Sequence, residues 1–251
     1  MRFSANLGFL WTELALPDGV RAAKAAGFDA VEIHAPDVPA AALKTALDET
    51  GLPILGLNTA RHETFGCAAL PGQSQKARAD VDAAVTYATA VGAQNIHVLA
   101  GVAWGPAAFT AYLETLGYAC RAAAAHGLTI LIEPINTNDV PGYFLNTTAT
   151  ALEVIGKLGV PNLKLMFDCY HVARSEGDVA RRLQVCLPYI GHIQFAGVPD
   201  RGRPDQGSLE YRALFAQIAQ LGWCAPLGAE YRPNGATEAT LGWLNGPDAL
   251  A

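Results

Sequence analysis

Charged residues are scarce in this chain of 251 residues. Asp, Glu, Lys and Arg make up 16% of it, while hydrophobic residues make up 51%; soluble domains typically carry roughly 25% charged residues. This balance excludes intrinsic disorder, which requires low hydrophobicity and high charge. The net charge is −6, from 17 basic and 23 acidic residues. The basic residues are scattered, so we expect neither nucleic acid nor a membrane surface as a partner.

Long hydrophobic runs are also missing. Residues 83–113 contain no Asp, Glu, Lys or Arg, but Gly92, Gly101, Gly105 and Pro106 divide them into pieces too short to cross a bilayer. The N-terminal residues lack the apolar core of a signal peptide. These absences predict a cytoplasmic protein.

Cysteine is sparse as well. The chain has five cysteines and no Cys-x-x-Cys motif. An odd number without that motif is typical of reduced, mostly buried thiols in a reducing compartment. We therefore expect no disulfide framework and no catalytic cysteine.

Short apolar runs alternate with alanine-rich amphipathic runs along the whole chain. The expected strands are residues 3–8, 30–34, 53–59, 95–101, 128–133, 163–167, 191–196 and 225–230. The expected helices are residues 18–26, 40–50, 74–91, 107–126, 148–158, 178–186, 209–221 and 236–244. Such alternation implies right-handed βαβ units and a parallel sheet. Eight units in about 250 residues favour one closed (β/α)8 TIM barrel over residues 1–251.

A doubly wound open sheet is the competing architecture. It usually carries a glycine-rich phosphate loop after its first strand. Here the first strand is followed by Gly-Phe-Leu-Trp-Thr, and no Walker-type loop occurs anywhere in the chain. The closed barrel is therefore favoured.

Polar residues end four successive strands in the second half of the chain. They are Glu133, Asp168, Gln194 and Glu230, with spacings of 35, 26 and 36 residues, about one βα unit each. Taken singly, such carboxylates often serve as helix caps or helix N-terminal charges. Together at one barrel mouth they would repel one another without a cation, and oxygen ligands suit a divalent metal ion such as Mg²⁺ or Mn²⁺.

Further polar residues follow the same strand ends. His171 lies three residues past Asp168, and Asn58 and Arg61 follow the third strand. Arg201, Arg232 and Arg61 could each bind an anionic substrate, because a guanidinium binds a carboxylate bidentately. A solvated surface position is the alternative for each of these residues. His192 points to the same side as Gln194 but deeper, as a core or supporting histidine.

These motifs together resemble the hydroxypyruvate isomerase family, within the xylose-isomerase-like TIM barrels. The most specific matches are Glu-Pro-Ile-Asn at 133–136 and Asp-Cys-Tyr-His at 168–171. The resemblance covers nearly the whole chain, and its other matching stretches are residues 2–7, 30–32, 70–72, 139–145, 162–164, 191–194, 200–202 and 230–233.

The resemblance assigns roles to residues already singled out. It implies that Glu133, Asp168, Gln194 and Glu230 are metal ligands, and that Glu133 and Glu230 are also the catalytic pair that moves the proton. His171 and Arg201 match substrate-contacting positions. The loop at residues 58–72 is shorter than is usual in the family. Phe65 and Arg232 also stand where the family more often has Arg and Lys.

The reaction implied by the resemblance is an aldose–ketose isomerisation between hydroxypyruvate and tartronate semialdehyde. The implied partner is a small hydroxy-carbonyl acid, and a homo-oligomer stays open. The nearest alternative is isomerisation of 2-oxo-tetronates; ketose epimerases place a His where Gln194 stands. A non-catalytic metal- or sugar-binding barrel is the alternative from another class. A nucleic-acid-repair barrel would need a basic face and more than the six His present.

Overall fold

Eight parallel strands close into a barrel in which each strand pairs with its neighbours in chain order. The computed structural model describes residues 1–246, 249 and 250. The strands are β1 Phe3–Asn6, β2 Ala30–Glu32, β3 Ile54–Asn58, β4 Asn95–His97, β5 Thr129–Ile132, β6 Leu163–Asp168, β7 Ile190–Phe195 and β8 Leu227–Ala229. The ring closes where Ser4 of β1 pairs with Gly228 of β8. The predicted barrel is confirmed.

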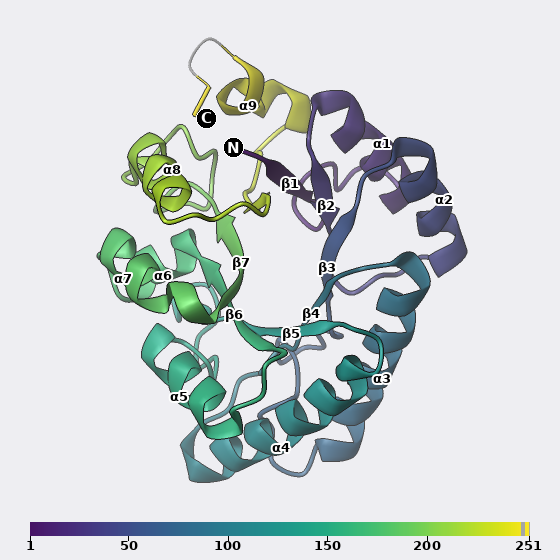
Figure 1. Cartoon of the computed structure of the whole chain (residues 1–251), viewed down its shortest axis with the longest axis vertical. Coiled ribbons are helices and arrows are strands. Elements are labelled where there is room, and N and C mark those ends of the chain that lie inside the picture. Colours follow the sequence, from purple (N-terminus) through teal and green to yellow (C-terminus); the bar gives the residue numbers. More distant parts are fainter. Residues whose placement is uncertain (247–248, 251) are drawn as a thin grey trace.

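Helices surround this ring of strands (Figure 1). They are α1 Leu16–Ala26, α2 Ala40–Thr50, α3 Ser74–Val91, α4 Gly105–Ala124, α5 Thr148–Leu158, α6 Cys169–Ser175, α7 Val179–Cys186, α8 Tyr211–Gln220 and α9 Gly242–Asn245. Two 3-10 helices cover Leu187–Tyr189 and Thr237–Thr240. Helices α2, α3 and α5 have the predicted bounds. Each ends at a left-handed glycine, which is a common way to close a helix.

The structure departs most from the predicted helices in two places. The single helix expected at residues 236–244 is instead a 3-10 turn followed by the short α9, in a stretch rich in Thr and Gly, which are weak helix formers. The helix at 178–186 is preceded by α6, which begins directly after β6. Asp168 caps α6 by accepting a hydrogen bond from the Tyr170 backbone N–H at 2.8 Å. Asp168 therefore caps helix α6 and also ends strand β6 at the barrel mouth.

An aromatic cluster holds the seam where the barrel closes. The Trp243 ring of α9 is fully buried and lies edge-on to Phe3 and Phe195, with centroids 5.2 and 5.4 Å apart. Phe215 of α8 packs 5.0 Å from Phe195. These contacts tie α8 and α9 to β1 and β7, and α9 lies on the same side of the ring as the N-terminus (Figure 1).

Among residues 1–246, 249 and 250, no helix combines the length and the apolar character needed to span a membrane.

Candidate active site at the barrel mouth

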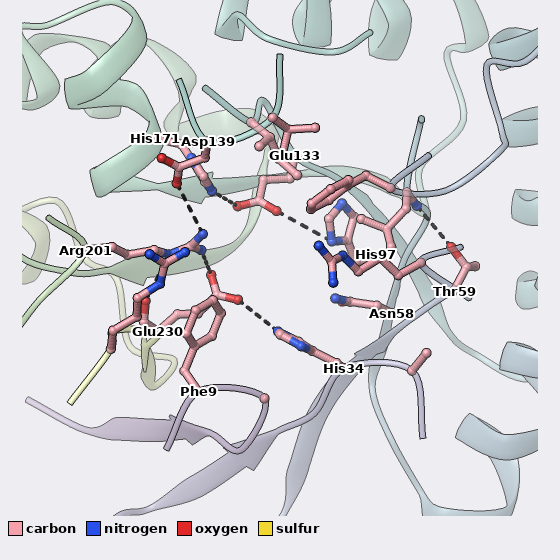
Figure 2. Close-up of a pocket in the computed structure, with 18 residues that line it drawn as sticks. Phe9, His34, Asn58, Thr59, His97, Glu133, Asp139, His171, Arg201 and Glu230 are labelled. Carbon is pink, nitrogen blue, oxygen red and sulfur yellow. Dashed lines mark hydrogen bonds and ion pairs between the residues drawn. The ribbon is translucent and has the colours of Figure 1, made fainter. Parts of the chain in front are cut away.

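A pocket of about 350 Å³ opens where the strands end. Figure 2 shows that its polar side chains come from several strands and converge on one space. Six predicted site residues line this pocket: Asn58, Arg61, Glu133, His171, Arg201 and Glu230. Asp168 contacts two of these lining residues, while Gln194 borders a smaller cavity deeper in the barrel.

Glu133, Asp168 and His171 form a compact buried group. Glu133 directly follows β5, Asp168 ends β6, and His171 lies in α6. The His171 Nε2 atom is 3.7 Å from a Glu133 oxygen and 3.6 Å from an Asp168 oxygen. One polar atom from each residue lies within 4.8 Å of the others, so the two carboxylates and the imidazole form one cluster.

Arg201 is the counter-ion of the mouth. Its guanidinium is 2.6 Å from the Glu230 carboxylate, 3.5 Å from Asp168 and 3.7 Å from Asp139. The planar group also lies over the Phe9 ring, 4.6 Å from its centroid. Arg201 thus lines the pocket as predicted, but Glu230 already binds its guanidinium.

The carboxylates differ in their charge environment. Burial, and then the charges of Glu230 and Asp168, raise the pKa of Glu133 well above its usual range. Burial likewise raises the pKa of Asp168 to about 7, although Arg201 opposes this. For Glu230 burial also disfavours the charge, but Arg201, His34 and His171 together outweigh it and lower the pKa to about 2. Negative charge is therefore compensated at Glu230 and left uncompensated around Glu133.

Two buried oxygens near the mouth and a third deeper in the barrel are available to a cation. Within the described part of the chain, Glu133 Oε1, Asp168 Oδ2 and Gln194 Oε1 have no hydrogen-bond partner. Buried polar atoms are normally satisfied, so orphaned acceptors at and below the mouth indicate a missing ligand. Carboxylate and amide oxygens are hard ligands of the kind that Mg²⁺ and Mn²⁺ prefer. The residues present therefore fit a divalent cation.

Gln194 lies level with Asp168, as predicted, but deeper than Glu230. It pairs in register with Asp168 on one side and with Gly228 on the other, two residues before Glu230. Its Nε2 atom donates to Glu32 at 2.8 Å, which fixes the amide so that Oε1 stays free. His192 Nε2 lies 3.0 Å from the other Glu32 oxygen, so His192 contacts the residue that orients Gln194.

A glycine on β8 makes room for this network. A Cβ at Gly228 would lie 2.2 Å from a Glu32 oxygen, 2.8 Å from Gln194 and 2.9 Å from His192. Such contacts are closer than real side chains tolerate. The Gly in the β8 sequence Leu-Gly-Ala is therefore required by the buried network around Glu32.

The hydrogen bonds around His171 fix its tautomer. Asn136 Oδ1 accepts from the backbone N–H groups of Asn138 and Asp139, so its Nδ2 must face His171. Nδ2 lies 2.7 Å from His171 Nδ1, which also accepts from the Asn136 backbone N–H. Because Nδ1 accepts, the proton of the neutral ring is on Nε2, the nitrogen that faces Glu133 and Asp168. His171 is therefore arranged to donate a hydrogen bond into the pocket.

Several residues at the mouth were missed by sequence analysis. His97 Nδ1 lies 3.6 Å from Glu133, and burial lowers the pKa of this histidine to about 4. His34 and Asn6 both contact a Glu230 oxygen, at 3.4 and 3.0 Å. The positions of these residues in the sequence could have revealed them, because each lies at the C-terminal end of its strand or just beyond it. Arg232, an open alternative from the sequence, lines the pocket and is exposed.

Comparison with protein families and known proteins gives a consistent result. The family model described as a xylose isomerase-like TIM barrel matches residues 20–246. A protein of Cupriavidus necator named 2-oxo-tetronate isomerase is 45% identical over 252 residues, covering 97% of each chain. A human protein named putative hydroxypyruvate isomerase is 38% identical, covering 97% of this chain and 94% of its own.

Solved structures share the architecture. A crystal structure described as AP endonuclease, family 2, from Brucella melitensis superposes with a TM-score of 0.93 at 34% identity, covering 96% of this chain and 97% of its own. A 3-keto-D-glucoside 4-epimerase from E. coli superposes with a TM-score of 0.80 at 22% identity, covering 96% and 97%. The second likeness bears on the fold alone.

Proposed function

Because this chain belongs to the xylose isomerase-like TIM barrel family, we propose that it is an aldose–ketose isomerase of a small hydroxy-carbonyl acid. The first candidate reaction interconverts hydroxypyruvate and tartronate semialdehyde. The observation that carries this proposal is the convergence of Glu133 and Glu230 on one pocket, with Asp168 contacting the arginine and the histidine that also line it. That set can hold a cation, move a proton and bind an anion.

Glu133, Asp168, Gln194 and Glu230 are the residues we assign to a divalent cation. Unpaired buried oxygens of Glu133, Asp168 and Gln194 support this assignment, while the Glu230 oxygens already accept hydrogen bonds from Asn6 and Arg201. Mg²⁺ and Mn²⁺ are the ions that suit the donors. A bound cation would supply stabilisation of the negative charge that develops on the substrate oxygens.

Glu133 and Glu230 are assigned the proton transfer. They follow β5 and β8 and approach the pocket from different sides (Figure 2). One carboxylate takes the proton from the hydroxyl-bearing carbon, and a carboxylate returns a proton to the former carbonyl carbon. The hydroxyl proton moves between the two substrate oxygens, so no atom or electron is gained or lost. His171 Nε2–H is placed to donate to one of these oxygens.

The anionic end of the substrate is assigned to the arginines. Arg201 offers the guanidinium N–H groups that its bond to Glu230 leaves free. Arg61 reaches the pocket from the loop after β3, and Asn58 lies at the end of β3. The Arg61 guanidinium is 3.9 Å from the Phe65 ring centroid, which steadies it at the rim.

A 2-oxo-tetronate, one carbon longer, is the second candidate substrate. The protein at 45% identity carries that name. The rim of the pocket also holds two exposed cations, Arg61 and Arg232, beyond the buried Arg201. The longer acid could therefore span the distance from the buried group to the rim.

A substrate panel separates these candidates. We expect turnover of hydroxypyruvate or a 2-oxo-tetronate with Mg²⁺ or Mn²⁺ present, and loss of turnover after exhaustive chelation, followed by recovery when the metal is restored. Product formation is measured with a coupled reductase. Neutral ketoses and an oligonucleotide carrying an abasic site serve as controls. Cleavage of the oligonucleotide without isomerisation of any acid would contradict the proposal.

Glu32→Gln tests how Gln194 is oriented. The change removes a charged acceptor that both Gln194 and His192 use, so the Gln194 amide loses its fixed direction. We expect Mn²⁺ affinity to fall roughly 10- to 100-fold, the usual cost of altering a partner of a metal ligand. Titration followed by electron paramagnetic resonance measures it.

Glu49→Gln is the matched control for this change, because Glu49 pairs with Arg21 on the surface. It should leave the affinity unchanged. If Glu32→Gln binds Mn²⁺ as tightly as the wild type does, then either Gln194 is not a metal ligand or Glu32 does not orient it.

A further inference from the structure

A second group of metal-ligand side chains lies outside the mouth. His62 and Cys67 belong to the loop between β3 and α3, and Asp80 lies in α3. His62 Nε2 is 2.7 Å from Asp80 Oδ2, and the Cys67 thiol donates to the same oxygen at 3.2 Å. One donor atom from each residue lies within 4.8 Å of the others. None of the three lines the mouth pocket.

We propose that His62, Cys67 and Asp80 form a second metal site, which binds a borderline cation such as Zn²⁺. One imidazole, one thiolate and one carboxylate match the ligands of zinc and differ from the oxygen ligands at the mouth. Two anionic ligands would neutralise the charge of the ion. The Cys67 thiol proton leaves to solvent as the sulfur–metal bond forms, and no electron is transferred.

Burial and backbone contacts favour this assignment. Cys67 is buried, whereas the side chains of His62 and Asp80 are 27% and 17% exposed, so an ion has a path from solvent and a position left for water. The loop is already held in place. The Val102 backbone N–H donates to the Thr64 carbonyl at 2.9 Å, and the Ala69 N–H donates to the Ala100 carbonyl at 2.7 Å. The ligands are therefore brought together before an ion binds.

A catalytic cysteine does not explain the group. A nucleophilic cysteine needs a base within reach, but the Cys67 thiol donates to Asp80 rather than to His62. Burial, and then the bond to Asp80, raise the pKa of Cys67 to about 12, which is the opposite of an activated thiol.

A cation bound by His62, Cys67 and Asp80 would affect the mouth pocket through the loop that both sites share. Arg61 and Phe65 lie on the same loop and line the mouth pocket. Cross-linking His62 and Cys67 to α3 would hold these two rim residues in place. The loop between β3 and α3 would then be anchored by metal as well as by hydrogen bonds.

Cobalt spectroscopy tests the proposal. The protein is saturated with Mg²⁺ and then titrated with Co²⁺, and the sulfur-to-cobalt charge-transfer absorption is recorded. We expect this absorption in the wild type and its loss in Cys67→Ser, which keeps a hydrogen-bond donor toward Asp80. His62→Ala and Asp80→Asn should each weaken cobalt binding at least tenfold. The number of zinc ions that stay bound per chain after dialysis should be lower by one in Cys67→Ser than in the wild type.

Two controls keep the outcomes separate. Cys224→Ser changes an exposed cysteine away from the group and should leave the absorption intact. Asp168→Asn, which alters the mouth, should also leave it intact, so a failure of the proposed isomerase site would not remove this signal. Absence of the absorption in the wild type at saturating cobalt, or its persistence in Cys67→Ser, would overturn the proposal. Native circular dichroism of Cys67→Ser excludes misfolding as the cause of a loss.

Discussion

Glu133→Gln and Glu230→Gln are each expected to lower kcat by about 10²–10⁴-fold, the usual contribution of a general acid–base group. Glutamine keeps the shape of the side chain but cannot accept or return a proton. The rate is measured on whichever acid the panel shows to be the substrate. Glu153→Gln, in an exposed pair with Lys157, is the matched control and should leave kcat unchanged. Near wild-type kcat in either mouth variant would place the proton transfer elsewhere.

The two variants should differ in stability, because the two carboxylates have different surroundings. Glu133 is buried among like charges, so its replacement by Gln in the metal-free protein should leave the free energy of unfolding unchanged or raise it. Glu230 is 2.6 Å from buried Arg201, and Gln leaves that cation with Asp168 and Asp139 at longer distances. Urea unfolding should therefore show a loss for Glu230→Gln only.

Arg201→Ala is expected to impair both binding and folding. Losing a charge-assisted hydrogen bond to the substrate carboxylate costs roughly 1.5–3 kcal/mol, or about 10- to 150-fold in KM. Removing one partner of a buried ion pair costs about 3–5 kcal/mol, because the remaining carboxylate is left uncompensated. Glu230 is that carboxylate here. Steady-state kinetics and urea unfolding measure the two effects.

Controls for Arg201→Ala come from the same face of the barrel. Arg203 pairs with Asp205 near the surface, and Arg203→Ala should cost no more than about 0–1 kcal/mol. An uncharged substrate analogue should be less affected than the acid by Arg201→Ala. If Arg201→Ala leaves KM for the acid unchanged and Arg61→Ala raises it, the substrate carboxylate lies under the loop after β3, and Arg201 serves Glu230 alone.

Much of the architecture was determined by local sequence pattern. Apolar runs alternating with amphipathic runs predicted eight βα units, and the glycines after α2, α3 and α5 marked where those helices end. Polar residues at successive strand ends predicted the mouth, because parallel strands in a barrel all end on one face. The helix expected at residues 236–244 failed because its Thr- and Gly-rich stretch forms helix weakly, and the short α9 is held instead by the burial of Trp243 against β1 and β7.

Only the tertiary structure decided how the site residues are paired. The sequence placed Arg201 and Glu230 at the same face but could not show that they bind each other, since 29 residues separate them. Glu32 and Gln194 are 162 residues apart in the sequence, yet they are hydrogen-bonded in the structure. Nothing in the short β2 sequence indicated that its buried carboxylate would orient an amide on β7. Side-chain direction depends on strand register and barrel closure, which arise from the whole fold. The sequence therefore determined which residues reach the mouth, and the packing of the barrel determined their partners.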